Sequence, residues 1–387
     1  AVRTVDGWPD LVVPLERHAR YFSQPWADFP ASYLADVEAF LKDSGESDIW
    51  DLVRKEACKP STISLRRRQL SLLSSLLINS GFPTADLTSL AVLVTPENAI
   101  AALKVQQKRK EREVSRTLEQ LVWLMTLIAR DWVKNKEHAE VLRAQAKMVH
   151  KKLGAHKGMT ERNQTRLRQF ESDANILALL DLPQKVFGEA RKASVGDAEE
   201  ARRVMLALAV EMLLCAMLRG ANLCGLEVDR HFIVIGRARE YERRLVIPAH
   251  EMKGTDKLEF SLPSESCDLL DEYLEVYRPR LAPTGSPFLF PNRFGKKREK
   301  AHFAKAVSDF ILEETGLAMN VHLFRHFAVK LHLKSHPEDM ETPRQFLMHR
   351  SSKVTRMHYT EARPEIAMSR YHQTVAGARL KFGKGSK

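Results

Sequence analysis

Six residues in the second half of the chain have side chains that could act together on a phosphodiester. They are, in chain order, Arg219, Lys253, His322, Arg325, His349 and Tyr359. A tyrosine hydroxyl has a pKa of about 10, so it is a weak nucleophile at neutral pH and needs positive charge or a base nearby. Two arginines could bind the non-bridging oxygens of the attacked phosphate and stabilise the charge that gathers there. The set therefore predicts cleavage of a phosphodiester by the protein's own tyrosine.

The positions of these residues suit those tasks. His322 and Arg325 have the i, i+3 spacing that places two side chains on one face of a helix. Arg219 follows a long apolar helix, and Lys253 begins the turn KGTD between two expected strands. A lysine at such a turn could reach into a groove and protonate the departing 5′-oxygen. His322 and His349 could donate to phosphate oxygens or accept the proton of the phenol.

Two of the six assignments have a competitor in the sequence. Lys257 lies on the same expected hairpin as Lys253 and is an alternative proton donor. Tyr371 is an alternative to Tyr359, but it lies 22 residues after His349, whereas Tyr359 lies 10 residues after it. Taken singly, an arginine at a helix end or an H-x-x-R pair usually has a structural role. The joint order of six residue types favours the catalytic interpretation.

The sequence gives no reason to expect a metal or another cofactor. His322 and His326 have the i, i+4 spacing of a metal-binding pair, but no third ligand at a suitable spacing accompanies them. The chain also lacks a cluster of carboxylates suited to Mg²⁺ and a glycine-rich phosphate loop. These patterns argue against nucleotide-dependent cleavage and against a two-metal mechanism.

The charge of the chain suits a polyanionic partner. Its 61 Lys and Arg residues outnumber 49 Asp and Glu, which gives a formal charge of +12. Residues 104–168 contain 17 basic and 7 acidic residues, a footprint typical of a nucleic-acid-binding surface, although a solvated helical face can have the same composition. The predicted DNA-binding residues are Arg66, Arg67, Arg68, Lys147, Lys151, Lys152, Lys157 and Arg162.

Hydrophobic periodicity predicts a mainly α fold with a small antiparallel β-sheet (α+β), in two domains. The first, residues 1–165, is expected to be a helical DNA-binding region that ends in a polar, basic linker at about residues 154–165. The second, residues 173–387, is expected to be the catalytic domain.

The expected elements follow from the same patterns. Helices are expected at residues 31–43, 64–81, 96–116, 118–133, 198–218, 267–277, 301–316, 322–333 and 364–376. Strands are expected at residues 231–235, 243–249 and 257–263. Thr95 and Pro96 should begin the third helix. Trp123 and Trp132 are expected to anchor the core of the first domain rather than to stack on bases.

The ordered set resembles the tyrosine recombinases, the phage integrase family, over about residues 175–375. The resemblance rests on the strings MLRGANLCGLEV, IPAHEMKGTDKLEFSLP, HLFR and MHRSSKVTRMHYT. It implies that Arg219 is the family's first arginine, Lys253 its hairpin lysine, His322 and Arg325 its H-x-x-R pair, His349 its second histidine and Tyr359 its nucleophile. It also implies a 3′-phosphotyrosyl link, a released 5′-hydroxyl, and strand exchange through a Holliday junction. The N-terminal helices are similar to the family's core-binding domain.

Three positions depart from the family pattern. The family often has an acid three residues after its first arginine, where this chain has Asn222. That acid buttresses the arginine, and the amide is expected to do so less strongly. The family often has glycine before its second histidine, where this chain has Met348. The interval between His349 and Tyr359 is one residue longer than is common.

The partners implied by the resemblance are double-stranded DNA, further copies of the chain in a tetramer on two DNA sites, and accessory DNA-binding proteins. A site-specific recombinase or integrase of a mobile element is the first interpretation. A type IB topoisomerase and a non-catalytic DNA-binding relative are the alternatives. No run of eighteen apolar residues predicts a membrane span, the first residues lack the apolar core of a secretory signal, and four scattered cysteines suggest reduced thiols. We therefore expect a cytoplasmic, nucleoid-associated bacterial protein.

Overall fold

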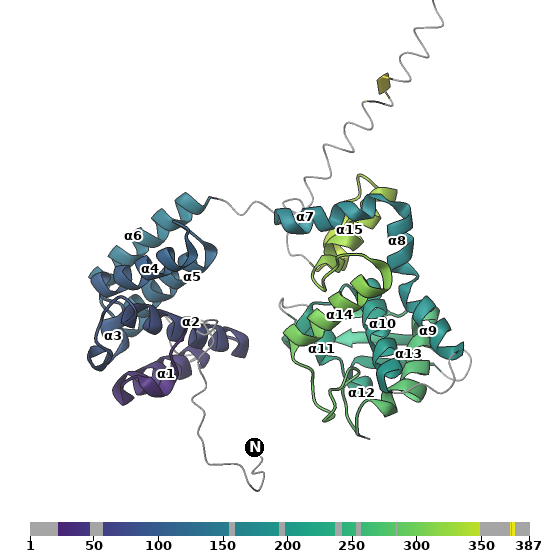
Figure 1. Ribbon diagram of the computed structural model, residues 1–387, viewed down its shortest axis with the longest axis horizontal. Helices are drawn as coiled ribbons and strands as arrows, with labels where there is room; N and C mark the ends of the chain where they lie inside the picture. The colour runs from purple at the N-terminus through teal and green to yellow at the C-terminus, as the bar shows by residue number, and fades with distance from the viewer. Residues whose placement is uncertain are drawn as a thin grey trace, which may run out of the picture. The chain divides into compact units, whose positions relative to one another are not determined.

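The structure, a computed structural model, describes residues 22–46, 57–154, 159–192, 198–236, 242–252, 257–283, 285–348, 372 and 374–375. The chain forms two compact units, Ala1–His156 and Lys157–Lys387, and the division falls inside the polar stretch of residues 154–165. Nearly all elements are helices, and the described residues contain one three-stranded antiparallel sheet (Figure 1). The predicted mainly α fold with a small antiparallel sheet is confirmed.

Unit 1 is a bundle of helices. They are α1 (Ala31–Gly45), α2 (Pro60–Ile78), α3 (Leu90–Leu93), α4 (Pro96–Lys110), α5 (Arg116–Leu127) and α6 (Lys136–Leu153). Helix α4 begins as predicted, because Pro96 occupies its first turn and the Thr95 hydroxyl accepts the amide N–H of Asn98 at 3.4 Å. Fully buried leucines of α2 and α5, among them Leu70 and Leu121, lie in the core.

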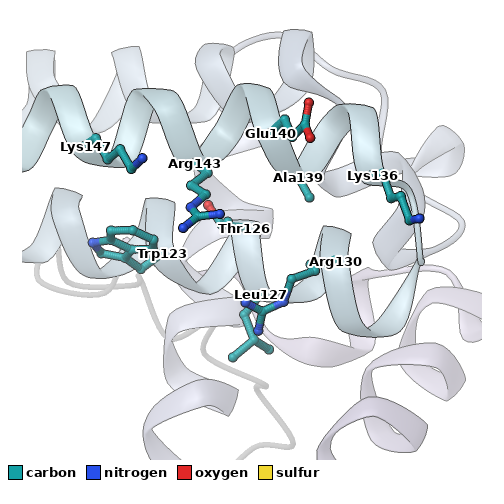
Figure 2. Close-up of a pocket in the computed structure, with 9 residues that line it drawn as sticks. All are labelled: Trp123, Thr126, Leu127, Arg130, Lys136, Ala139, Glu140, Arg143 and Lys147. Atoms are coloured by element: carbon teal, nitrogen blue, oxygen red, sulfur yellow. The ribbon is translucent and has the colours of Figure 1, made fainter. Parts of the chain in front are cut away.

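The two tryptophans of unit 1 have different environments. Trp132 packs against the core, and its indole N–H donates to Asp36 Oδ1 at 2.7 Å. The prediction of a core position is wrong for Trp123, which is 40% exposed beside a groove between α5 and α6 (Figure 2). The reason is the position of Trp123 around the axis of α5, which decides whether a side chain faces the core. Val122 and Leu124 take the core-facing positions of α5, and the indole between them points outward.

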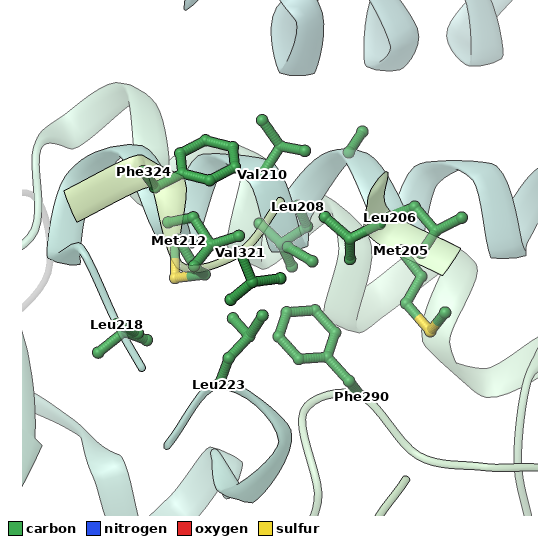
Figure 3. Close-up of a cluster of buried hydrophobic side chains, with 14 of the residues drawn as sticks. Met205, Leu206, Leu208, Val210, Met212, Leu218, Leu223, Phe290, Val321 and Phe324 are labelled. Atoms are coloured by element: carbon green, nitrogen blue, oxygen red, sulfur yellow. The ribbon is translucent and has the colours of Figure 1, made fainter. Parts of the chain in front are cut away.

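Unit 2 begins with four helices, α7 (Glu161–Arg168), α8 (Asp173–Leu180), α9 (Leu182–Lys192) and α10 (Ala198–Ala216). From Val204 onward helix α10 is apolar on all sides apart from Glu211, as a helix inside a core must be. Figure 3 shows Met205, Leu208 and Met212 of α10 among buried side chains from other parts of the unit, such as Phe290 and Phe324. The end of this central helix leads to Arg219.

The other α-helices and the strands of unit 2 follow α10 in the chain. They are α11 (Gly220–Gly225), α12 (Val228–His231), β1 (Phe232–Ile235), β2 (Glu242–Ile247), β3 (Leu258–Ser261), α13 (Ser264–Glu272), α14 (Lys300–Thr315), α15 (Leu323–Ser335) and α16 (Glu341–Phe346). The strands pair in the order β1-β2-β3, with Leu245 of β2 opposite Phe232 and Phe260. All three strands fall where the sequence predicts them. Most of the helix expected at residues 364–376 lies outside the described residues.

Among the helices that the structure describes, none combines the length and the apolar character needed to cross a bilayer.

Candidate active site and DNA-binding surfaces

Arg325 joins two distant segments of unit 2. It lies in the first turn of α15, and only 7% of it is exposed. Its Nη1 donates to the carbonyl oxygen of Met217 at 2.9 Å, and its Nη2 donates to that of Leu347 at 2.6 Å. Met217 is two residues before Arg219, and Leu347 is two residues before His349. One buried guanidinium therefore fixes the backbone that leads to two other predicted site residues.

Both of these segments contain a residue in the left-handed region of backbone space. Met217 has φ of 46° and Met348 has φ of 52°. Left-handed backbone costs a residue with a side chain roughly 1–2 kcal/mol, and such strain concentrates at functional sites. Met348 stands where the family resemblance expects glycine, and its positive φ gives the physical reason for that preference.

Arg219 stands immediately before α11 in extended backbone, with φ of −73° and ψ of 146°. Its side chain is half-buried, and this burial lowers the pKa of the guanidinium from its ordinary value. An arginine nevertheless stays protonated at neutral pH. No hydrogen bond or ion pair joins this guanidinium to another residue of the described ranges. A half-buried cation of this kind is suited to an external anion.

A hydrogen-bonded cluster holds the chain that follows β2. The amide of Asn222 donates from Nδ2 to the carbonyl oxygen of Glu251 at 3.2 Å. The Glu251 carboxylate accepts a bond from Nε2 of the buried His231 at 3.1 Å and pairs with Arg230. His231 Nδ1 accepts the backbone N–H of Glu227 at 2.8 Å, so a neutral ring carries its proton on Nε2. The cluster fixes Glu251, two residues before Lys253 in the sequence.

Sequence reasoning missed this cluster. We expected Asn222 to support Arg219, and the bond that the described residues show instead runs to the backbone of Glu251. Asn222, His231 and Glu251 are widely separated in the sequence and form no short motif. Only the fold brings them together.

His322 is exposed at the N-terminal end of α15, and its ring lies edge-on to that of the buried His326, with 5.2 Å between ring centroids. His322 and Arg325 thus lie at the start of one helix, as their spacing predicts. Lys257, the competitor of Lys253, is exposed and pairs with Glu259 at 2.7 Å.

The other predicted catalytic residues lie outside the described residues. They are Lys253, His349 and Tyr359, together with the competitor Tyr371. Within the described ranges, no three His, Cys, Asp or Glu side chains form a group that could hold a metal ion.

A comparison with models of protein families shows which family this part of the chain matches. Residues 189–365 match the model of the phage integrase family. This segment therefore belongs to that family. This phage integrase domain contains all six predicted catalytic residues, from Arg219 to Tyr359.

Three solved structures show how the chain compares with known recombinases. The XerH site-specific recombinase bound to palindromic difH substrate, a post-cleavage complex, is 17% identical, with a TM-score of 0.44 over 87% of this chain and 95% of that chain. A lambda integrase tetramer bound to a Holliday junction is 13% identical, with a TM-score of 0.46. The match covers 84% of this chain and 76% of that chain. A lambda integrase(75–356) dimer bound to a COC′ core site is 11% identical, with a TM-score of 0.44. The match covers 84% of this chain and 94% of that chain. No curated protein matches the sequence.

N-terminal to the phage integrase domain, the predicted DNA-binding arginines of α2 differ in how they are engaged. Arg67 pairs with the Glu38 carboxylate through both of its terminal nitrogens. Arg66 donates to the Ser44 hydroxyl at 2.7 Å. Arg68 is exposed. Two of these three guanidiniums therefore already have a partner within the protein.

The predicted lysines at the end of α6 divide in the same way. Lys152 pairs with Glu113, whereas Lys151 is exposed. Lys147 lines the groove between α5 and α6. Of the other two predicted residues, Arg162 is exposed on α7 and Lys157 lies outside the described residues.

The groove between α5 and α6 brings Lys147 together with three cations that the sequence analysis did not select. It has a volume of about 530 Å³, and Trp123 of α5 and Arg143 of α6 both face it (Figure 2). Its charged lining residues are Arg130, Lys136, Glu140, Arg143 and Lys147. The last four recur at helical spacing on one face of α6, a signal that was present in the sequence. The groove therefore presents four cations and one acid on the described part of unit 1.

Proposed function

We propose that this chain is a site-specific DNA recombinase that cuts and rejoins DNA through a covalent 3′-phosphotyrosine at Tyr359. The observation that carries the proposal is the pair of bonds from Arg325 to the carbonyls of Met217 and Leu347. These bonds tie the backbone before Arg219 and the backbone before His349 to the helix that bears His322. The family assignment of residues 189–365 supports the same conclusion.

The cleavage step follows from the chemistry of these side chains. The phenol oxygen of Tyr359 attacks the scissile phosphorus, a tyrosine–phosphate bond forms, and the bond from phosphorus to the 5′-oxygen breaks. Lys253 gives a proton to the departing oxygen. Arg219 and Arg325 stabilise the charge on the non-bridging oxygens, while His322 and His349 donate to the phosphate or take the proton of the phenol. Attack by a 5′-hydroxyl of a different strand reverses the step and joins the DNA anew.

Binding of the duplex involves both units. In unit 1 the groove cations and the exposed Lys151 and Arg68 contact phosphates, and in unit 2 the exposed Arg162 does so. Such contacts hold the DNA without reading its sequence. Further copies of the chain complete a tetramer on two DNA sites, and strands exchange through a Holliday junction. The natural role that we propose is recombination of a mobile element.

The test is a search for the covalent adduct. On a nicked duplex that traps the intermediate, the full chain should give a denaturation-resistant adduct with the 3′-phosphate on Tyr359, in the presence of EDTA. Tyr359→Phe removes one oxygen and little volume, so it should abolish the adduct and leave DNA binding intact. Tyr371→Phe is the matched control and should retain the adduct.

Three outcomes would overturn the proposal in different ways. DNA mapped to Tyr371 would reassign the nucleophile, and an adduct that needs Mg²⁺ would exclude the two-arginine mechanism. Efficient relaxation of a plasmid without any specific site, and without Holliday junctions, would identify a topoisomerase instead.

A further inference from the structure

The phage integrase domain presents a basic hairpin, residues 291–298, that belongs to none of the site residues above. An isolated β-bridge joins Pro291 to Lys297 and closes the hairpin. Asn292 organises its turn, since its Oδ1 accepts the backbone N–H of Phe294 at 2.9 Å and that of Lys296 at 3.0 Å. Gly295 has φ of 71°, which a residue without a side chain adopts freely. The turn is therefore fixed by its own hydrogen bonds.

The base of the basic hairpin is anchored in the core. Leu289 and Phe290, just before it, are completely buried. The hydroxyl of Tyr273 donates to the Leu289 carbonyl at 3.0 Å, and the hydroxyl of Ser286 donates to the Gly295 carbonyl at 2.7 Å. These contacts predict that the tip is held in one conformation.

The tip exposes an aromatic ring among cations. Phe294 is 65% exposed, the highest value among the large apolar side chains of the described residues. The Arg293 guanidinium lies 4.6 Å from the centre of its ring, within the range of a cation–π contact. Lys296 and Lys297 are exposed beside it. The ring is thus held in water beside several cations on a rigid turn, where a ligand can reach it.

The basic hairpin lies against the helix that follows Arg219. A Cβ atom placed on Gly225, at the end of α11, would be 2.9 Å from the ammonium nitrogen of Lys297. A Cβ atom placed on Gly220, directly after Arg219, would be 3.4 Å from Cε of Lys300. The cations of this loop thus lie along α11, and α11 begins at the predicted phosphate-binding arginine.

The composition of the loop indicates which class of ligand it would bind. Residues 292–300 contain five Lys and Arg and a single acid, Glu299. Cations flanking an exposed aromatic ring match a nucleic-acid duplex, because the cations meet phosphates and the ring can wedge against a base step. We propose that the basic hairpin binds duplex DNA beside the scissile phosphate, with Lys296 and Lys297 on phosphates and Phe294 against the bases. This inference rests on the proposed function, since it needs DNA at Arg219.

The first experiment measures affinity of the full chain for a random-sequence duplex by fluorescence anisotropy and does not depend on cleavage. Phe294→Ala should weaken binding about tenfold, as loss of one stacking contact does. Leu312→Ala is the matched control, because Leu312 is a 50% exposed apolar residue on α14, and it should leave affinity unchanged. Changing Lys296 and Lys297 together to Ala should lower the salt dependence by about 1.8 units of log K per log salt, for two phosphates lost.

The second experiment places 2-aminopurine at each position flanking the mapped cleavage site. Wild-type protein should raise the fluorescence at one base step by unstacking it, and Phe294→Ala should abolish the rise while Phe294→Trp retains it. Equal affinity of Phe294→Ala and Leu312→Ala, with no responding base step, would overturn the inference. A change only in self-association would do the same and would assign Phe294 to a protein interface. Adduct formation by the wild type in that case leaves the proposed function standing, so the two failures are distinguishable.

Discussion

Arg219 and Arg325 carry the same guanidinium in opposite surroundings. Arg325 is buried at the start of α15, and its terminal nitrogens donate to two backbone carbonyls from distant segments. Arg219 is half-buried before α11 and has no partner among the described residues. The comparison indicates that Arg325, besides its proposed role at the phosphate, holds the backbone of the site together, whereas Arg219 has no such structural bond among the described residues. The two can be separated by measuring stability and cleavage in the same variants.

Arg325→Ala should have the largest effect, because it should damage both stability and cleavage. Two carbonyls would lose charge-assisted hydrogen bonds, so we expect the free energy of unfolding to fall by about 3 kcal/mol. The backbone before Arg219 and before His349 would lose its common attachment, and adduct formation should disappear. Urea denaturation and the adduct assay measure the two effects. An unchanged free energy of unfolding would show that the two hydrogen bonds do not hold these segments.

Arg219→Ala should slow adduct formation by roughly 10²–10³-fold, the usual loss for one preformed donor to the transition state. The free energy of unfolding should change by less than about 0.5 kcal/mol, since no described residue loses a partner. Arg219→Lys should rescue only in part, because the ammonium lacks the planar fork. Arg191→Ala, which removes an exposed pair with Glu272, controls for the loss of one positive charge. A loss of stability as large as that of Arg325→Ala would erase the distinction between the two arginines.

The same contrast between engaged and available cations applies to unit 1. Arg67 pairs with Glu38, whereas Arg143 faces the groove between α5 and α6. Arg143→Ala should weaken binding to all duplexes alike and lower the salt dependence by about 0.9 units of log K per log salt. Arg67→Ala should change the salt dependence much less. Titrations at several salt concentrations compare the two, and equal slopes would mean that pairing within the protein does not decide which cations meet DNA.

Local signals were sufficient for much of the fold. The three strands and the helix with His322 and Arg325 occur where alternation and spacing predict them, and Thr95 with Pro96 begins α4 as the capping pattern requires. These features depend on residues close to one another in the sequence, so a short segment is enough to predict each of them.

Features that depend on distant residues could not be predicted in this way. The carbonyl acceptors of Arg325 lie 108 and 22 positions away in the sequence, and any backbone carbonyl could have served. The outward phase of Trp123 depends on which face of α5 the other helices cover. The pairing of Arg67 depends on α1 lying beside α2. The positions of Lys253, His349 and Tyr359 in the site stay predictions, because they lie outside the described residues.

The smallest expected effect concerns the backbone that Arg325 holds. Met348 has φ of 52°, directly after the Leu347 carbonyl that Arg325 binds. Met348→Gly and Met348→Ala both remove the half-buried side chain, but only glycine relieves the left-handed strain. The glycine variant should therefore be more stable than the alanine variant by about 1 kcal/mol, measured by urea denaturation. The comparison between these two variants cancels the loss of packing, which would obscure a comparison with the wild type. An alanine variant at least as stable as the glycine variant would show that the segment before His349 is not held in the left-handed conformation in solution.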